Sequence, residues 1–399
     1  MLVVCAWGAA SCSRTELDVF GAANGSAGAA QAQGGATGAA GGTQEMNGAD
    51  AAACTWTFAP QVTYPAGGYP VALAIADFTG DGVPDMLTLN GVGNDIALLR
   101  NLGNGTFEPR ATTPVGSMPY GMEVADLSGD GALDLPIIYE FQADGVSHEV
   151  DILLNRGNGT FAPAVSYPIN GGAFSITAGD FNADGRLDLV VADANTNLSV
   201  LANQGEGTFA PPLTYKSGSG DQVAVADFNH DGLLDLATAG FAMNVLLNQG
   251  AGSFAAPVVY PNADDCAGPM IAEDLTGDGY PELIRSCYQL GGYLVMRTNT
   301  GDGTLGPEAQ YMTGQWPWGL VVGDFTGDGR KDLAAANSWA YANSVSVLPG
   351  MASNTLGSTI TYAATSPNFI AAGDLNGDGH DDLATAGADT LTVLLSRCE

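Results

Sequence analysis

The chain has 399 residues and carries 11 Lys and Arg against 43 Asp and Glu, which gives a formal net charge of −32. Phosphate binding needs clustered basic side chains, so this charge balance argues against a nucleic-acid partner. Because 46% of the residues are hydrophobic and only 14% are charged, the chain is not an acidic disordered tail, and its 56 glycines predict dense turns rather than long helices.

Residues 1–20 are predicted to be a leader. The apolar stretch MLVVCAWGAAS ends in small residues directly before Cys12. This order resembles a bacterial lipobox, so we expect Cys12 to be lipidated after signal cleavage and to anchor the mature protein at an outer membrane. The basic segment that normally opens a signal peptide is missing here. The alternatives are an ordinary secretory signal and an unstructured start.

Residues 21–53 are predicted to be a flexible tether. They consist mainly of Gly, Ala, Ser and Gln, with almost no large apolar side chain. Such a segment buries too little surface to offset the entropy lost on ordering. A tether of this kind would connect a lipid anchor to a folded domain at residues 54–399.

A nonapeptide of the form D-x-[TSN]-x-D-G-x-x-[DE] recurs seven times. The copies start 49, 54, 47, 47, 50 and 50 residues apart, and this near-constant period indicates a repeat architecture. The copies begin at Asp77, Asp126, Asp180, Asp227, Asp274, Asp324 and Asp374.

Each repeat holds four short apolar runs bounded by turn signals. One run enters the nonapeptide (QVAVADF), one leaves it (DLVVADA), a third follows (VDILLN), and the fourth comes after a Gly-rich hairpin such as GNGTF. Runs of this length and composition predict strands. Four antiparallel strands per repeat of about 50 residues predict an all-β fold, a seven-bladed β-propeller. The alternative, a linear β-solenoid, would have shorter repeats and no reason to stop at seven.

The two ends of the chain are predicted to share the last blade. Residues 57–64 (TFAPQVTY) match the fourth strand of the repeat but precede the first nonapeptide, and the last repeat stops after its third strand at 391–396. We therefore expect the N-terminal segment to supply the outer strand of blade seven. This arrangement would leave no open edge between the first and last blades.

Four cysteines are predicted to form two disulfides. Cys54 and Cys398 lie beside the donated strand and the last strand, where a bond would replace the missing hairpin. Cys266 and Cys287 fall in loops of the fifth repeat that should share one face. Disulfides imply an oxidising, extracytoplasmic compartment, and free buried thiols are the alternative.

The nonapeptides are predicted to bind calcium. Side-chain oxygens recur at positions 1, 3, 5 and 9, a backbone carbonyl is available at position 7, and Gly at position 6 allows a tight turn. Cys is absent from the copies and His occurs only at 230 and 380, which argues against zinc or copper. The predicted ligands are Asp77, Thr79, Asp81, Val83 and Asp85; Asp126, Ser128, Asp130, Ala132 and Asp134; Asp180, Asn182, Asp184, Arg186 and Asp188; Asp227, Asn229, Asp231, Leu233 and Asp235; Asp274, Thr276, Asp278, Tyr280 and Glu282; Asp324, Thr326, Asp328, Arg330 and Asp332; and Asp374, Asn376, Asp378, His380 and Asp382.

Two alternatives for these loops stay open. Acidic turns held by Asx-type hydrogen bonds would need no metal. A bound metal could also act in catalysis or bridge a ligand. Because each loop supplies its own set of oxygens, we expect up to seven Ca²⁺ ions, mainly in a structural role.

The loop DFNADGRLD and the downstream pattern L-L-N-x-G-x-G-T-F resemble the FG-GAP/VCBS repeat family, which includes the integrin α-subunit propeller and many secreted bacterial proteins. The resemblance covers about residues 54–399. It implies a seven-bladed propeller with Ca²⁺ in loops on one face. Because the family includes adhesion modules, lectins and subunits appended to enzymes, it implies no single activity.

The face opposite the calcium loops is predicted to be aromatic. Trp316, Trp318, Trp339 and Tyr341 cluster in the sixth repeat and are the predicted ligand-binding residues. Exposed flat rings stack on sugars or anchor a protein partner. The alternative is that the rings pack between blades as core. The other aromatic residues expected on this face are Tyr69, Tyr120, Tyr139, Phe141, Phe174, Tyr288, Tyr293 and Phe369.

Catalytic signatures are missing from the sequence. It has no G-x-S-x-G elbow, no P-loop and no dinucleotide-binding fingerprint, so we expect no enzyme. We expect a monomeric, calcium-stabilised binding or adhesion module, secreted or held at the surface of a bacterium through its lipid anchor, with a protein partner. The alternatives are a lectin that holds glycans on the aromatic face and a polysaccharide lyase or hydrolase.

Overall fold

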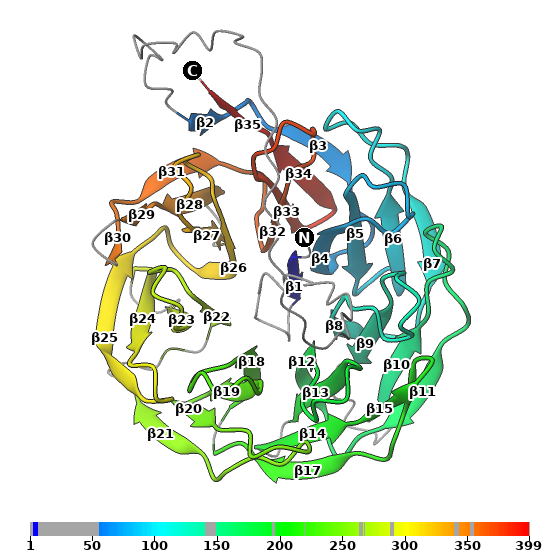
Figure 1. The fold of residues 1–399 in the computed structure, drawn as a ribbon. Helices are drawn as coiled ribbons and strands as arrows, with labels where there is room; N and C mark the ends of the chain where they lie inside the picture. The colour runs from blue at the N-terminus through cyan, green and yellow to red at the C-terminus, as the bar shows by residue number, and fades with distance from the viewer. Residues whose placement is uncertain are drawn as a thin grey trace, which may run out of the picture.

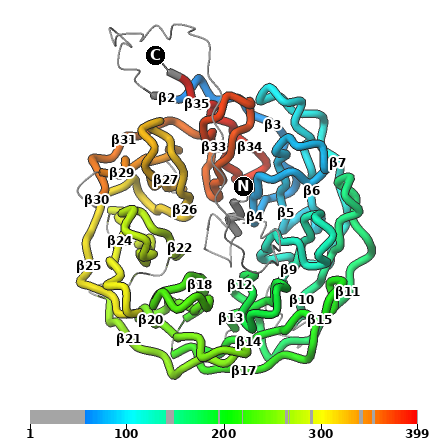
Figure 2. Tube along the Cα trace, viewed as in Figure 1, coloured from blue at the N-terminus to red at the C-terminus, as the bar shows by residue number. Residues whose placement is uncertain are grey.

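The computed structural model is a ring of seven antiparallel sheets, a seven-bladed β-propeller in which each blade has four strands from the axis to the rim and blade one has an additional inner strand (Figure 1). The predicted fold is therefore confirmed. The tube in Figure 2 follows the chain once around the ring, from blade one in blue to blade seven in red. The described part of the chain contains no helix, and so none that could cross a membrane. The described residues are 3–6, 56–139, 149–193, 196–218, 220–262, 266, 268–287, 291–338, 343–351 and 355–398.

Each blade runs from an inner strand beside the central axis to an outer strand at the rim. The inner strands are β4 (Pro70–Ala76), β8 (Pro119–Met122), β12 (Ala173–Gly179), β18 (Gln222–Ala226), β22 (Met270–Glu273), β26 (Pro317–Gly323) and β32 (Phe369–Gly373). The second strands are β5 (Asp85–Asn90), β9 (Leu135–Tyr139), β13 (Asp188–Asp193), β19 (Asp235–Ala239), β23 (Glu282–Cys287), β27 (Asp332–Asn337) and β33 (Asp382–Gly387). The third strands are β6 (Asp95–Leu99), β10 (Glu149–Leu153), β14 (Asn197–Leu201), β20 (Ala242–Leu246), β24 (Tyr293–Asn299), β28 (Ser344–Leu348) and β34 (Thr390–Leu394). The outer strands are β7 (Ala111–Pro114), β11 (Val165–Pro168), β17 (Leu213–Lys216), β21 (Val258–Pro261), β25 (Leu305–Met312), β31 (Ile360–Ala363) and β3 (Val62–Pro65).

Further short strands accompany the blades. One of them, β1 (Val3–Ala6), lies inside the ring and pairs antiparallel with the inner edge of β4. Blade one thus has five strands in the structure. The remaining pairs are β15 (Asn203–Gly205) with β16 (Thr208–Phe209), β29 (Gly350–Met351) with β30 (Thr355–Leu356), and β2 (Trp56–Phe58) with β35 (Ser396–Cys398).

The ring closes as the sequence predicts. Strand β3 is the outer strand of blade seven and pairs with β34, with Val62 opposite Val393. Strands β2 and β35 take the place of the hairpin that the other blades have, with Trp56 opposite Cys398. The proposed partner of Cys398, Cys54, lies outside the described residues. The last blade therefore combines both ends of the described propeller.

Packing between blades begins at the second residue of each nonapeptide. This residue is Phe or Leu in every copy, and its side chain is buried. Burial of a large apolar side chain contributes about 1.5–3 kcal/mol. The Phe or Leu at position 2 therefore attaches each acidic loop to the hydrophobic core. The seven residues are Phe78, Leu127, Phe181, Phe228, Leu275, Phe325 and Leu375.

An asparagine at the start of the Gly-rich hairpin joins neighbouring blades. The Asn155 side chain of blade two donates to the carbonyl oxygens of Phe78 in blade one and Leu133 in its own blade, at 2.9 and 3.2 Å. Its carbonyl oxygen accepts from the N–H of Gly157. The same bond to the preceding blade is made by Asn101, Asn203, Asn248 and Asn299.

Within the described chain, blade six has no asparagine bond of this kind to either of its neighbours. Gly350 and Ser396 stand where the asparagine would be in blades six and seven. Neither side chain can supply a carboxamide, so this tie is absent on both sides of blade six. The contacts that join these blades include the Lys331–Glu273 ion pair and the edge-to-face ring pair of Phe58 and Tyr362.

Replacing Asn155 with Ala is expected to lower the free energy of unfolding by about 3 kcal/mol, because two buried carbonyl groups lose their donor. Urea unfolding of the purified protein measures this loss. The control is Asn158→Ala in the same hairpin, where the exposed side chain only caps the N–H and hydroxyl of Thr160. Equal losses in both variants would contradict a role for Asn155 between blades.

Candidate metal loops and ligand-binding face

The seven nonapeptides connect the inner and second strands, so they lie on one face of the ring together with the Gly-rich hairpins. Glycine at position 6 is required by the backbone, since its φ lies between 80° and 89° in every copy. The turn brings positions 1 to 9 back on themselves within one loop. The structure thus has the tight turn that the sequence predicts.

Backbone N–H groups bind the acidic side chains of each loop. In the first loop the carboxylate of Asp77, at position 1, accepts from the N–H groups of Asp81 and Gly82. The carboxylate of Asp81, at position 5, accepts from the N–H of Val83. These bonds are the Asx-type contacts of an acidic turn. They recur in the other six loops.

The carboxylate at position 9 is buried in all seven loops. One oxygen accepts from the N–H of position 2, as Asp85 does from Phe78. In six blades the position-9 carboxylate also accepts from the N–H of the first residue of the hairpin or of its equivalent, as Asp85 does from Asn101. The position-9 side chain therefore fastens the acidic loop to the hairpin beside it.

Burial raises the pKa of these carboxyl groups. Loss of hydration is the main cause, and neighbouring carboxylates add to it in most loops. The pKa rises to about 6 for Asp134, Asp235 and Asp332, and to about 7 for Glu282 and Asp382. The pKa values of Asp85 and Asp188 are raised as well. In the absence of a cation, the ionised form of each group is thus disfavoured.

Several predicted ligand oxygens lack a hydrogen-bond partner. Asn182 Oδ1, at position 3 of the third loop, and Glu282 Oε1, at position 9 of the fifth, are buried without one. Buried oxygens without a donor cost free energy, and a hard cation would satisfy them. Among the described residues, no three His, Cys, Asp or Glu side chains converge closely enough to form a metal cluster. The donor chemistry therefore fits calcium, while the loops in this structure are closed by hydrogen bonds.

Two loops carry a cation of their own. Arg186 and Arg330, both at position 7, form ion pairs with the position-5 carboxylates Asp184 and Asp328. Part of the negative charge of the third and sixth loops is thereby neutralised. The seven loops are thus not equivalent in the charge that they offer to a metal ion.

The opposite face carries the aromatic residues, but some of these are core. Tyr139 is buried and its hydroxyl donates to Asp151 at 2.6 Å, and Phe369 is buried between blades. Trp316 and Trp318 are half-buried. The other two predicted ligand-binding residues, Trp339 and Tyr341, lie outside the described residues. The aromatic residues on this face therefore include both buried core side chains and partly exposed ones.

Four consecutive blades present a strained residue on this face. In blades six, seven, one and two, a residue with positive φ is followed by proline. This proline opens the inner strand of blades six, one and two and lies two residues before β32 in blade seven. These inner strands contact one another in that order around the ring. We call the four residues the proline arc: Trp316 (φ 56°), Ser366 (φ 46°), Tyr69 (φ 55°) and Met118 (φ 56°).

Positive φ is unusual for bulky residues, and a following proline disfavours it further. Such conformations cost about 1–3 kcal/mol each and persist only where the surroundings impose them. Here the turns between second and third strands do so: Tyr69 N–H donates to Asp389, and Met118 N–H donates to Asn94. Tyr69 and Met118 remain 45% and 43% exposed. The strain thus holds apolar side chains at the surface.

Sequence analysis missed the proline arc and the inter-blade asparagines. The signal for the arc was a proline seven residues before the first Asp of four nonapeptides. The signal for the asparagines was their recurrence at the head of the hairpin. The Cys266–Cys287 disulfide expected from the sequence is present, with Cα atoms 4.5 Å apart.

Comparison with known proteins supports the repeat interpretation. The FG-GAP-like repeat family matches residues 141–191, 180–238 and 274–335. No curated protein matches the sequence. A lectin from Agrocybe aegerita, which recognises non-reducing terminal N-acetylglucosamine, is 20% identical with a TM-score of 0.53, over 84% of this chain and 86% of the lectin. BBS1N, solved in complex with ARL6DN, is 13% identical in crystals soaked with mercury or lead, with TM-scores of 0.59 and 0.60, over 86% of this chain and 97% of BBS1N. At these identities the likeness concerns the fold.

Proposed function

We propose that this propeller of FG-GAP-like repeats is a calcium-stabilised, extracytoplasmic module that binds a protein partner at the cell surface. The observation that carries the proposal is the proline arc, which keeps large apolar side chains at the surface against their backbone preference. Strain of this kind gathers at functional sites. The opposite face, with its acidic loops, is assigned a structural role.

Calcium would be held by the oxygens of the nonapeptides. In the first loop these are the side chains of Asp77, Thr79, Asp81 and Asp85 and the carbonyl group of Val83. The ion would neutralise carboxylates that otherwise repel one another and would satisfy buried oxygens such as Asn182 Oδ1. The protein's own contribution is the turn, which the backbone N–H groups hold at fixed geometry. Metal binding is therefore proposed to stabilise the ring rather than to react.

An extracytoplasmic location is supported by the Cys266–Cys287 disulfide, because such bonds persist in oxidising compartments. Attachment through Cys12 remains a proposal from the sequence, as do the monomeric state and the lack of enzymatic activity.

A protein partner is favoured by the extent of the arc. Its residues come from four blades, and three of the four are Trp, Tyr and Met, residue types that are enriched at protein interfaces. A set of apolar anchors spread over neighbouring blades suits a broad surface better than a small ligand. The structural neighbour crystallised with ARL6DN is an example of a propeller in a protein complex.

Replacing Trp316 with Ala is expected to weaken binding of the partner at least 30-fold, the loss typical of a hot-spot Trp of about 2 kcal/mol. The partner is isolated with the intact protein, and its affinity for each variant is measured by biolayer interferometry. The control is Phe241→Ala, because Phe241 is 89% exposed in blade four, outside the arc. Equal affinity of the two variants would rule out the arc as the docking surface.

Glycan binding is the second candidate. Trp316 lies directly before β26 and Trp318 is the second residue of that strand. Both are half-buried, and flat rings of this kind stack on sugars. The lectin among the structural neighbours supports this reading of the fold. Binding on a glycan array that disappears in a Trp316→Ala/Trp318→Ala variant would favour a lectin. Release of sugar or an unsaturated product from a polysaccharide would instead identify an enzyme.

A further inference from the structure

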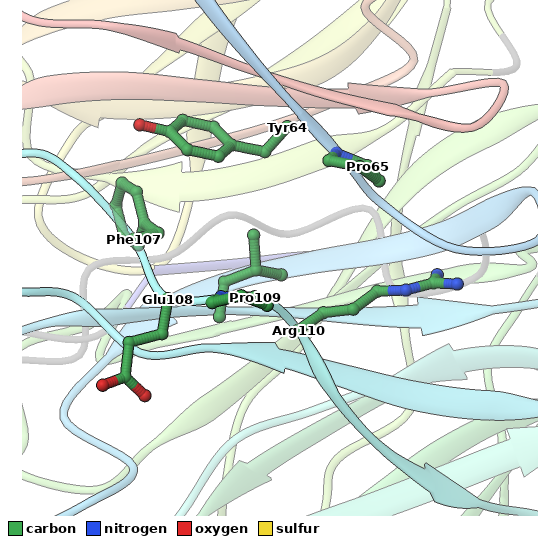
Figure 3. A pocket seen from close by; sticks show the side chains of 7 residues that line it. Tyr64, Pro65, Phe107, Glu108, Pro109 and Arg110 are labelled. Carbon is green, nitrogen blue, oxygen red and sulfur yellow. The ribbon is translucent and has the colours of Figure 1, made fainter.

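A cavity of about 360 Å³ lies at the seam between blades seven and one (Figure 3). Strand β3 supplies Tyr64 and Pro65, the end of β6 supplies Leu99, and the hairpin before β7 supplies residues 107–110. The cavity therefore exists only because the N-terminal segment completes blade seven. Its volume falls within the range of small-ligand and side-chain pockets.

The aromatic wall of this cavity is a feature of several seams. Tyr64 packs edge-to-face on Phe107, with ring centres 5.3 Å apart and planes at 78°. Tyr167 with Phe209, and Tyr215 with Phe254, repeat this contact at two other seams, each at 5.4 Å. The ring pair alone is thus part of the blade packing and does not distinguish this seam.

The residues that follow the phenylalanine do distinguish it. Blade one continues from Phe107 with Glu108, Pro109 and Arg110. Blades three and four, whose hairpins supply Phe209 and Phe254, carry the uncharged sequences Ala-Pro-Pro and Ala-Ala-Pro at the same positions, 210–212 and 255–257. One acidic and one basic side chain are therefore placed beside the apolar pocket at this seam and not at those two.

The two charged side chains of the pocket, Glu108 and Arg110, are exposed and are not paired with another described residue. Arg110 makes no ion pair or side-chain hydrogen bond with any described residue, although the chain has a net charge of −32. The other described Arg and Lys side chains are engaged in ion pairs, hydrogen bonds or electrostatic contacts. The side-chain carboxylate of Glu108 and the hydroxyl of Tyr64 are also unpaired in this part of the structure.

The two charges lie on either side of the apolar surface. Figure 3 shows the side chains of Glu108 and Arg110 pointing in different directions from the segment that contains Pro109, with Tyr64 and Phe107 beside them. An apolar group bound in this cavity would have a carboxylate and a guanidinium in the lining around it, on Glu108 and Arg110. In an extended peptide, side chains two residues apart point to the same side and lie about 7 Å apart.

We propose that this seam pocket binds an extended peptide segment of a partner protein with the pattern basic-x-apolar-x-acidic. The apolar side chain fills the space between Tyr64, Leu99 and Pro109. The acidic side chain of the peptide pairs with Arg110, and its basic side chain pairs with Glu108. A peptide bound here contacts both the donated strand and blade one, so it stabilises the closed ring. This site is separate from the proline arc and does not depend on it.

The test uses the full-length protein and a fluorescein-labelled, C-terminally amidated pentapeptide, Lys-Ser-Phe-Ser-Asp. Fluorescence anisotropy should report saturable binding, and the neutral peptide Gln-Ser-Phe-Ser-Asn should bind at least tenfold more weakly. The Arg110→Glu variant should lose at least tenfold in affinity for the charged peptide. It should regain affinity for a peptide in which Lys replaces the Asp, because the opposite charges then meet again.

Lys216→Glu is the matched control, since it makes the same change of net charge on the outer strand of blade three. Its affinity for the charged peptide should equal that of the wild type. If both variants lost the same affinity for the charged peptide, the loss would come from the change in net charge alone, and the proposal would be overturned. It would also be overturned if millimolar peptide did not bind, or if 3-phenylpropionate bound as tightly as the peptide, since a small amphipathic acid would then suffice.

Discussion

Removal of divalent metal with EDTA is expected to lower the Tm of the protein by on the order of 10 °C or more, and added calcium is expected to restore it. A ligand that binds only the folded state stabilises it by about 2.7 kcal/mol per site at 100 times its Kd. Several occupied loops would add contributions of this size. Since 1 kcal/mol shifts the Tm of a large domain by about 2–4 °C, the combined effect is readily measured by scanning calorimetry.

The pH dependence should differ in sign with and without calcium. In the metal-free protein, burial raises the pKa of Asp134 and Asp332 to about 6 and that of Glu282 and Asp382 to about 7, above the value of about 4 for an unfolded carboxyl group. The folded state then holds more protons, so stability present below pH 4 is lost as the pH rises through 6 to 7. With calcium, stability should rise over the same range, because the ion binds the ionised carboxylates.

Calorimetry at pH 5 and pH 7.5, in EDTA and in calcium, tests both statements. The variant Asp382→Asn should reduce the rise in Tm caused by calcium and flatten the pH dependence in EDTA. The control is Glu206→Gln in an exposed hairpin of blade three, which removes one charge without touching a nonapeptide. A melting curve that is the same in EDTA and in calcium would show that the nonapeptides are acidic turns held by hydrogen bonds without a metal ion.

Local sequence signals were sufficient to predict the fold. The nonapeptide, the hairpin glycines and the four apolar runs each act within about 50 residues, and seven copies repeat the same information. Closure of the ring was predictable because residues 57–64 have the pattern of an outer strand. They precede the first nonapeptide, so the other three strands of their blade had to come from elsewhere in the chain. The prediction of calcium rests on the same local pattern, and the loops have the tight glycine turn that this pattern predicts.

Contacts between blades were beyond the reach of the local pattern. Asn155 reaches a carbonyl group 77 residues away, and nothing in its own hairpin indicates that partner. The aromatic face was over-assigned for the same reason: Tyr139 and Phe369 are buried, because side-chain direction near a strand end depends on the neighbouring blade. The positive φ of Trp316 and the unpaired Arg110 likewise follow from packing that only the assembled ring defines.

The second large effect is expected from the closing strand. Removing residues 1–66 should abolish the cooperative unfolding transition or lower the Tm by on the order of 20 °C, because β2 and β3 are lost and β34 becomes an open edge. The deletion also removes Phe58 and Tyr64, which pack on Tyr362 and Phe107. Loss of one buried aromatic side chain typically costs about 3–5 kcal/mol, so the two losses together approach the whole stability of many proteins.

The matched control removes residues 1–53 and keeps both closing strands. Blade one retains its own four strands in this variant, because only β1 is lost from its inner edge. Calorimetry should therefore find a Tm within a few degrees of that of the full chain. Supplying a peptide of residues 56–66 in trans to the shorter protein should recover part of the lost Tm, since the edge of β34 can then be paired again. If the 1–66 deletion melts like the 1–53 deletion, the seventh blade is stable with three strands and the ends of the chain do not hold the ring closed.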